Sequence, residues 1–405
     1  MDDEARTIGL RLSRIREARG KTLRVIAELA GMSTSTLHRI EHGQRAVTVS
    51  EIRPLASALE VAPSELTKLS VPAPANGHTD STTEAVRLAL DAIEIGQPGG
   101  IVLPVSALRD QVARIHAQRR ACRFAEVATD LPGLIRNLHT TLATGTDHGE
   151  LLDLAVYLHV HVTRMWLVHA AAPTDLVRRL VFLAQRLARE RDEVSTLAVA
   201  GFGVADVLLA GGAFEPSRAR LDSLTLPPVT ADTAGFVAVA TACHALAAVL
   251  DGRPGDAAAP MDAAAEIAAR FDVDFLPPVP APTDVGTDRF VFGSVDAGIA
   301  RMWVALEVGD PDQAVSIAQD VHPERHPFPV NQAHYWTHYG RALAGLRGRA
   351  DDAVRALRTA EDIFPTKVRR DPWVREVVAT LLPGARRDAV GMEIRGLAYR
   401  TGLSV

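Results

Sequence analysis

Apolar residues recur at helical spacing in two short segments near the N-terminus. In the first segment, Ile26, Ala27 and Ala30 fall on one face of a helix. In the second, Leu37 and Ile40 give a helix its buried side. The pattern therefore predicts two short helices joined by a tight turn.

The residues that flank these segments fit helix ends. Thr22 and Ser33 stand where a side-chain oxygen can accept a hydrogen bond from a free amide in the first turn. Gly31 lies between the two helices, where the chain must turn sharply and a side chain would clash. Each end of the predicted turn thus has its own chemical signal.

The side of the second helix that faces away from the apolar stripe is polar. It carries Thr34, Ser35 and His38, which are small or polar and can both donate and accept hydrogen bonds. A helix with such an outer face suits the major groove of DNA. The plainer alternative is that Thr34 and Ser35 are first-turn residues of an ordinary exposed helix.

Residues 8–66 resemble the Xre/Cro-repressor type of helix-turn-helix domain, without a gap. The resemblance implies a five-helix, lambda-repressor-like DNA-binding domain whose recognition helix lies near residues 33–41. It rests on the following positions: Ala27, Gly31, Ser33, Arg39, Ile40, Glu41, Gly43, Arg45, Glu51, Leu59, Val61 and Leu66.

The resemblance also implies roles for single residues. Thr34, Ser35 and His38 would face base edges, while Arg45 and the start of the first motif helix would touch phosphates. Two positions depart from the family pattern: Leu23 replaces a usual Gln at that start, and Pro54 falls inside the expected fourth helix, where it is tolerable only near the helix start. The complete set of expected DNA contacts is Arg24, Thr34, Ser35, Thr36, His38, Arg39 and Arg45.

Charge is unevenly distributed along the chain. The whole protein has 44 Lys and Arg against 49 Asp and Glu, a net charge of −5. Residues 1–69 hold 11 basic and 9 acidic residues, a net of +2, which leaves 33 − 40 = −7 for the remainder. A cluster of basic residues near the N-terminus could contact phosphates and make DNA binding salt-dependent. The alternative is that it forms a solvated helix face. The cluster consists of Arg6, Arg11, Arg14, Arg16, Arg19, Lys21 and Arg24.

The rest of the 405-residue chain predicts helices almost throughout, so the fold class is all-α. Pro, Gly and small polar residues mark a linker at 70–81, after which residues 82–405 form the second domain. Helix-ending glycines recur at Gly212, Gly252, Gly309 and Gly348, and an acidic residue after Gly309 and Gly348 begins the next helix. Repeated helical hairpins at such spacing predict an α-solenoid.

The last unit of this array resembles a tetratricopeptide repeat. Gly348, Ala353, Leu357, Ala360 and Pro365 keep the second-helix spacing of that family, whereas its first helix and the longer period depart from it. The overall layout resembles bacterial regulators that join an Xre-type domain to a tetratricopeptide array, including peptide-sensing quorum regulators. That likeness implies a domain that dimerises and senses a ligand.

Two features of the second domain are candidates for ligand binding. One is a Pro-rich insert at Phe271–Gly293, and the other is the polar-aromatic segment Asn331–Arg341. The alternative for the insert is a surface loop without a function. Asn and Arg can bind a peptide backbone or its carboxylate, although Trp336 and Tyr339 could simply be core residues. The candidate ligand residues are Phe292, Arg301, Asn331, His334, Tyr335, His338 and Arg341.

Several other classes of site are not favoured. Cys122 and Cys243 lie far apart, which argues against a disulfide scaffold or a Cys-based zinc site and fits the cytoplasm. The spacing of His322 and His326, or of His334 and His338, could place two metal ligands on one helix face, but prolines interrupt the first pair and we expect no metal and no cofactor. Two apolar segments, Leu197–Phe214 and Thr233–Leu250, fit buried helices better than membrane spans.

The sequence thus predicts a cytoplasmic, sequence-specific transcriptional regulator that binds a double-stranded DNA operator as a homodimer. A peptide or small molecule in the helical domain would control it, and no membrane is involved. The alternative is an interaction scaffold whose helical array docks a partner protein onto DNA. No nucleotide-binding loop or catalytic motif is present in the sequence, so an enzyme is not expected.

Overall fold

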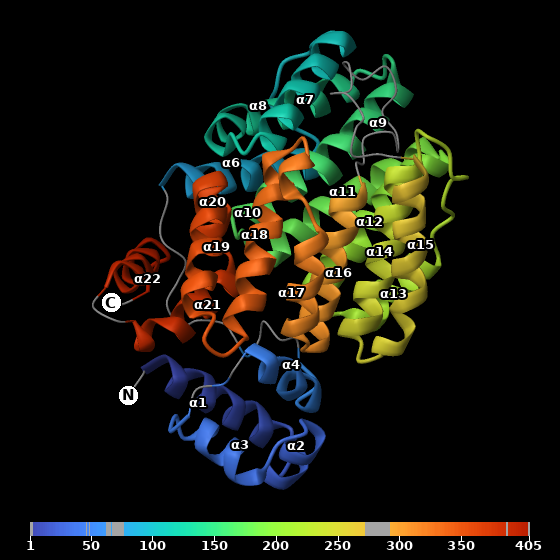
Figure 1. Cartoon of the computed structure of the whole chain (residues 1–405). Coiled ribbons are helices and arrows are strands. Elements are labelled where there is room, and N and C mark those ends of the chain that lie inside the picture. The colour runs from blue at the N-terminus through green and yellow to red at the C-terminus, as the bar shows by residue number, and fades with distance from the viewer. Residues whose placement is uncertain are drawn as a thin grey trace. The chain divides into compact units, whose positions relative to one another are not determined.

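The computed structural model describes residues 3–45, 47, 49–61, 66, 77–271, 292–385 and 388–403. Every regular element in these ranges is a helix, which confirms the predicted all-α class (Figure 1). The chain divides into two compact units. The first comprises Met1–Pro74, Arg301–Asp320 and Ala333–Val405, and the second Ala75–Ala300 and Val321–Gln332.

The N-terminal domain has four described helices: α1 (Asp3–Ala18), α2 (Leu23–Leu29), α3 (Thr34–Glu41) and α4 (Val49–Ala58). Their apolar faces enclose one core, in which Leu37, Ile40 and Leu55 are fully buried. The expected fifth helix lies outside the described residues except for Leu66, which is buried in the same core. The periodicity of the sequence thus located the core of this domain.

The turn between α2 and α3 forms as the sequence predicts, but glycine is needed at position 31 for a different reason than expected. The Thr22 hydroxyl accepts from the Val25 amide at 3.3 Å, and the Ser33 hydroxyl accepts from the Thr36 amide at 3.1 Å. Gly31 has φ +67°, the left-handed region, but a Cβ there would meet no atom within 4 Å. The expected clash is therefore wrong, and the backbone conformation is what requires glycine.

Two positions show how the core tolerates or demands unusual residues. Pro54 is the sixth residue of α4 rather than a residue near its start, so the expectation about its place is wrong. The buried Ile52 and Leu55 on the same helix offset the lost backbone bond. Gly9 lies where α1 crosses α3, and a Cβ there would lie 2.1 Å from the carbonyl oxygen of Ile40.

The remainder of the first unit is a helical assembly, and its described residues form two cores. Val354, Val374 and Leu397 belong to one, and Ala314, Leu343 and Ala353 to the other. Its helices are α17 (Pro311–Asp320), α19 (Ala350–Ile363), α20 (Pro365–Arg370), α21 (Pro372–Leu381) and α22 (Ala389–Arg400), together with the C-terminal parts of α16 (Ser294–Val308) and α18 (Pro329–Ala344).

In the second unit most helices pack against helices that are next, or next but one, in the sequence. From α11 to α15 every helix contacts the next, and α12 also contacts α14, which is the packing expected of a solenoid of helical hairpins. Its main helices are α6 (Gly77–Glu94), α7 (Val105–Arg120), α8 (Phe124–Leu142), α9 (His148–Tyr157), a π-helical segment (Leu158–Thr163), α10 (Arg164–His169), α11 (Thr174–Arg191), α12 (Val194–Ala210), α13 (Phe214–Asp222), α14 (Ala234–Leu250) and α15 (Ala258–Phe271).

The glycines of the predicted repeat end helices as expected. Gly212, Gly252, Gly309 and Gly348 all have positive φ, between +79° and +85°. After Gly309, the Asp310 carboxylate accepts from the Gln313 amide at 2.8 Å, which caps the next helix. In α19, the side chains that resemble a tetratricopeptide repeat are buried: Ala353, Leu357 and Ala360.

Three predicted segments can be placed against the helices. Helix α6 begins at Gly77, inside the segment predicted as a linker. The Pro-rich insert lies outside the described residues except at its ends. The two apolar segments correspond to α12 and α14. One further helical stretch, His148–His169, is long and apolar enough to cross a membrane by length and composition alone, although 83% of its 18-residue apolar window is buried inside the protein.

Candidate nucleic-acid interface

Helix α3 separates its residues sharply between core and solvent. Leu37 and Ile40 are fully buried and hold the helix against the rest of the domain. Thr34, Ser35 and His38 are exposed, as the sequence predicts for the side that would read base edges. A short helix fixed by its apolar side therefore presents a row of small and polar groups to solvent.

The N-terminus of α3 contains a network of hydroxyl groups. The Ser33 hydroxyl, besides capping the helix, lies 3.1 Å from the Ser35 hydroxyl and 2.8 Å from the Thr36 hydroxyl. Thr36 is only half-exposed. The cap thus positions two of the hydroxyls that were assigned to DNA, and it fixes Thr36 more firmly than Ser35.

A second histidine, which the sequence analysis did not select, orders the end of α3. The rings of His38 and His42 stack with their centroids 4.0 Å apart and 21° between their planes. Nδ1 of His42 lies 2.8 Å from the carbonyl oxygen of His38. The stacking holds the exposed His38 ring in place, and the four-residue spacing of the two histidines was the signal that could have revealed it.

The expected phosphate-binding arginines differ in their availability. Arg24 and Arg39 are exposed and, among the residues that the structure describes, form no ion pair. The Arg45 guanidinium instead bonds the Glu51 carboxylate at 2.8 Å and is about two-thirds buried. Arg45 thus has a structural partner as well as its predicted role.

Much of the basic cluster around α1 serves the fold. Arg16 donates two hydrogen bonds to Glu41, at 2.7 and 2.8 Å, and this bonding raises the pKa of the guanidinium. Arg19 pairs with Glu60 at 3.0 Å, and Arg11 donates to the carbonyl oxygen of Leu66 at 3.0 Å. The Arg6 side chain lies outside the described residues.

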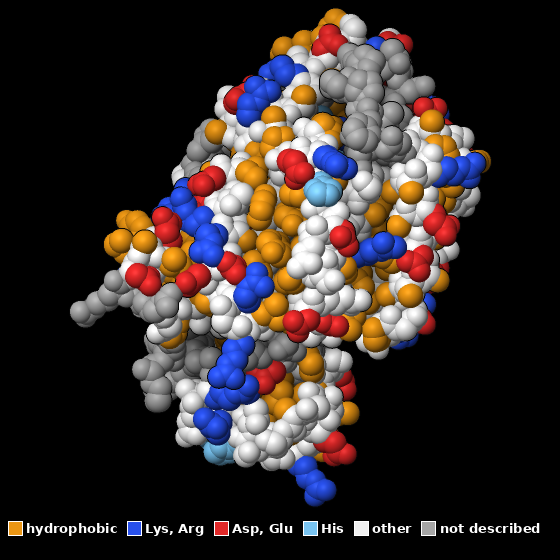
Figure 2. Space-filling view, in the orientation of Figure 1, with side chains coloured by type: hydrophobic (Ala, Val, Ile, Leu, Met, Phe, Trp, Pro, Cys, Tyr) orange, Lys and Arg blue, Asp and Glu red, His pale blue; other side chains and the backbone are white. Residues whose placement is uncertain are grey.

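Other basic side chains of the domain are exposed to solvent. Arg14, like Arg24 and Arg39, is exposed without an ion pair among the described residues. Figure 2 shows Lys and Arg side chains in a strip along the N-terminal domain, with a histidine at its lower end.

Leu23, which stands where the family that this domain resembles usually has Gln, is partly buried and packs against the core.

The candidate ligand residues of the C-terminal region fall in different units. Phe292 and Asn331 belong to the second unit, and the remaining five belong to the first. Phe292 is buried. The amide of Asn331 donates to the Asp296 carboxylate at 2.5 Å, and the same carboxylate lies 3.2 Å from Nε2 of the buried His326. Asn331 is thus part of an internal polar cluster.

The residues of the first unit in this set also have internal partners. The Tyr335 hydroxyl donates to the carbonyl oxygen of Ala318 at 3.0 Å. The buried Arg341 donates to Glu307 at 3.2 Å and lies over the Trp373 ring at 4.3 Å. Burial lowers the pKa of His338 well below its usual value, and Arg301 is exposed while His334 is half-exposed.

The alternative interpretation of this helix as core has support at two positions. Trp336 and Tyr339 are partly buried and pack against the cores of the first unit. Among the described residues, no group of three or more His, Cys, Asp or Glu side chains could hold a metal ion. The two cavities lined by α11, α12 and α13 have other residues in their walls than the seven candidate ligand residues.

Comparison with known families agrees with the geometry of α2 and α3. A family described as a helix-turn-helix domain matches residues 7–69 of this chain. The N-terminal domain is a helix-turn-helix domain. In such domains the second motif helix enters the major groove, and α3 occupies that position in this one.

No curated protein matches the chain. Among solved structures it is similar to the crystal structure of Bacillus thuringiensis PlcR in complex with the peptide PapR7 and DNA. That similarity covers 91% of this chain and 99% of the other, at 12% identity and a TM-score of 0.31. Such values are too low for the roles of PlcR residues to be transferred to this chain.

Proposed function

We propose that the protein is a sequence-specific DNA-binding transcriptional regulator. The observation that carries the proposal is the exposed polar side of α3, which the buried Leu37 and Ile40 and the Ser33 cap hold in a fixed orientation. Side-chain hydroxyls and imidazoles can exchange hydrogen bonds with base edges. Ser35 and His38 read the operator bases, and Arg24 and Arg39 contact the phosphates.

The proposal includes a homodimer in the cytoplasm. One small helix-turn-helix domain makes few base contacts, so two copies on half-sites about 34–36 Å apart give useful specificity. The large helical region supplies the dimer contacts and the effector site. An effector switches the regulator only when its affinity differs between the DNA-binding arrangement and the other arrangement.

The base-reading assignment is tested by comparing Ser35→Ala and His38→Ala with the unchanged protein. Electrophoretic shifts would use the operator obtained by selection and a scrambled duplex of equal length. Each substitution is expected to weaken operator binding by about 1–3 kcal/mol and to leave scrambled DNA nearly unaffected. Equal losses on both duplexes would overturn the assignment.

Arg24→Ala is the matched variant for phosphate contact. It should weaken binding to both duplexes and reduce the slope of log affinity against log salt by about 0.9 for one lost contact. Circular dichroism of all three variants checks that the domain stays folded. Unchanged salt slopes would remove Arg24 from the interface, and co-purification of a stoichiometric protein that is needed for DNA binding would favour the scaffold alternative.

A further inference from the structure

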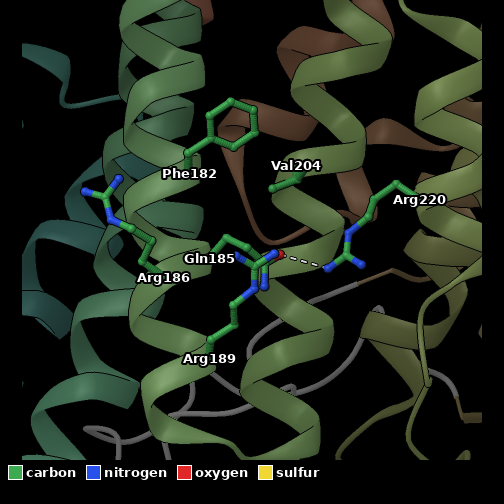
Figure 3. Close-up of a pocket in the computed structure, with 6 residues that line it drawn as sticks. All are labelled: Phe182, Gln185, Arg186, Arg189, Val204 and Arg220. Atoms are coloured by element: carbon green, nitrogen blue, oxygen red, sulfur yellow. Dashed lines mark hydrogen bonds between the residues drawn. The ribbon is translucent and has the colours of Figure 1, made fainter.

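The surface of the second unit has a hollow between α11, α12 and α13. It consists of two adjoining cavities of about 280 and 290 Å³, and both are lined by Gln185, Arg189 and Arg220 (Figure 3). Volumes of this size lie at the lower end of the range for small-molecule sites. The sequence analysis did not select any of these residues, because they come from separate helices.

The hollow has an excess of positive charge. Arg189 is exposed at the hollow and forms no ion pair among the described residues. Arg220 is half-buried and, in the described part of the chain, donates to two neutral groups, the Gln185 amide oxygen at 2.8 Å and the Ser223 hydroxyl at 3.1 Å. Two guanidinium groups therefore share one small space, and no Asp or Glu is among the described residues that line it.

The third arginine of the hollow is different. Arg186 donates to the Glu94 carboxylate at 3.1 Å, so its charge already has a partner. Figure 3 shows it pointing away from Arg220, whereas Arg189 lies beside Gln185. Burial, and then the charge of Arg189, lower the pKa of Arg220, which is the effect expected of a guanidinium that lacks a counterion.

The position of Arg220 depends on the small size of a neighbouring residue. A Cβ at Gly201 would lie 2.5 Å from Nη2 of Arg220 and 2.4 Å from Cδ2 of Leu224. Glycine at this point of α12 lets the guanidinium lie across the helix and reach Gln185. Gln185 itself is only 6% exposed, so the group that orients Arg220 is fixed in the packed layer.

Most of the remaining lining is apolar, and Ser223 and Thr225 add two hydroxyl groups to the second cavity. Phe182 is 42% exposed on α11, and Val194 is 50% exposed at the start of α12. Leu197 and Leu224 complete the wall of the second cavity. An occupant that matches this lining has one anionic group for the arginines and an apolar body for these side chains.

We propose that the hollow binds a carboxylate ligand with an apolar body, held by Arg189 and Arg220, and that this ligand is the effector of the regulator. A guanidinium forms a two-point hydrogen bond with a carboxylate, and the apolar wall disfavours small inorganic anions. The effector role rests on the proposed function in DNA binding, whereas the binding site itself does not.

The same chemistry can come from a free carboxylic acid or from the C-terminal carboxylate of a peptide. Calorimetric titration of the full-length protein would therefore use two matched pairs of probes, up to millimolar concentration. One pair is octanoate and octanamide, and the other is Val-Leu-Phe with a free C-terminus and its C-terminal amide. Octanoate binding alone identifies a small acid, peptide-acid binding alone identifies a peptide terminus, and both support the carboxylate site.

The variants are Arg189→Gln and its matched control Arg186→Gln, two exposed positions on the same helix. Loss of a charge-assisted hydrogen bond in Arg189→Gln should weaken carboxylate binding about 10- to 100-fold. Arg186→Gln should change it less than about threefold, because Arg186 is paired with Glu94. The proposal is overturned if neither acid binds, or if each acid binds no more tightly than its amide. It is also overturned if both variants lose the same amount of carboxylate affinity.

Electrophoretic shifts with the operator separate this inference from the proposed function. Both variants should bind operator as the unchanged protein does in the absence of a carboxylate, and only Arg189→Gln should lose the response to it. A protein that binds DNA but no carboxylate refutes the site alone. A protein that binds the carboxylate but shows no preference for any DNA refutes the proposed function and leaves the site standing.

Discussion

The ion pair between Arg16 and Glu41 joins α1 to the end of α3. The Glu41 side chain is 2% exposed and that of Arg16 is 13% exposed, with the closest atoms 2.7 Å apart. The substitution Glu41→Ala would leave the Arg16 guanidinium largely buried without its main partner. We expect this single change to destabilise the domain severely.

The size of the effect follows from the surroundings of the pair. Removal of one member of a buried ion pair costs about 3–5 kcal/mol. Arg16 would keep a bond to the carbonyl oxygen of Lys21 at 3.2 Å, longer contacts of 3.4 Å with Ser13 and Glu17, and some contact with water. We therefore expect the lower end, about 3 kcal/mol, which is comparable to the whole stability of many domains of this size.

Hydrogen exchange measured by mass spectrometry reports this loss in the full-length protein. A change of about 3 kcal/mol corresponds to roughly 150-fold faster exchange of the amides of α1 and α3. The matched control is Glu28→Gln, which removes an exposed carboxylate that has no ion pair among the described residues. Its exchange should change by less than about twofold.

A double variant tests the physical reason. Arg16→Met with Glu41→Leu removes both charges and leaves groups of similar length, so it should lose only about 1 kcal/mol. The argument would be refuted if the double variant were as unstable as Glu41→Ala. It would also be refuted if Glu41→Ala exchanged at the rate of the Glu28→Gln control.

Three further predictions concern separate parts of the chain. Gly9→Ala should cost about 1–3 kcal/mol and abolish operator binding, because the added Cβ would meet the Ile40 carbonyl oxygen at 2.1 Å; hydrogen exchange of α1 checks this. Burial lowers the pKa of His139 to about 4, and His159 beside it shifts in the same direction. Because the folded pKa is lower than the unfolded value of about 6.5, stability should fall as pH drops below 6.5, by about 2 kcal/mol at pH 5 from His139 alone and by more with His159 included, in urea titrations followed by circular dichroism. Glu361→Gln should cost about 3 kcal/mol, seen as faster exchange in α19 and α22, because the carboxylate, 1% exposed, bonds three arginines.

Each of these has a result that would contradict it. Normal operator binding by Gly9→Ala would show that α1 and α3 need not approach closely. For the histidines, equal stability at pH 5 and pH 7 would show that they are not held neutral. A Glu361→Gln variant with unchanged exchange in α22 would show that the three arginines do not depend on that carboxylate.

The sequence alone predicted the two helices α2 and α3 and their turn, because interactions between residues close in the sequence determine where helices begin and end. The Thr22 and Ser33 caps and the glycine at position 31 each act within three or four residues of themselves. The four repeat glycines were predicted for the same reason. Helix type and helix ends are thus largely set by neighbouring residues.

Contacts between distant residues could not be predicted in this way. Glu41 matched the family pattern, but nothing in the sequence indicated that Arg16, 25 positions earlier, would be its partner. The polar segment around Asn331 suggested a ligand surface, yet the Asn331 side chain donates a hydrogen bond to Asp296 inside the protein. The arginine-lined hollow combines residues of three helices, and only their packing brings Arg189 and Arg220 together.

The most direct test of the central claim is selection of genomic DNA fragments by the purified full-length protein at low salt. The account predicts enrichment of one sequence with two half-sites about one helical turn apart, and loss of that enrichment with His38→Ala. Retention of all fragments in the proportions of the input, both alone and with octanoate or the peptide acid present, would contradict it.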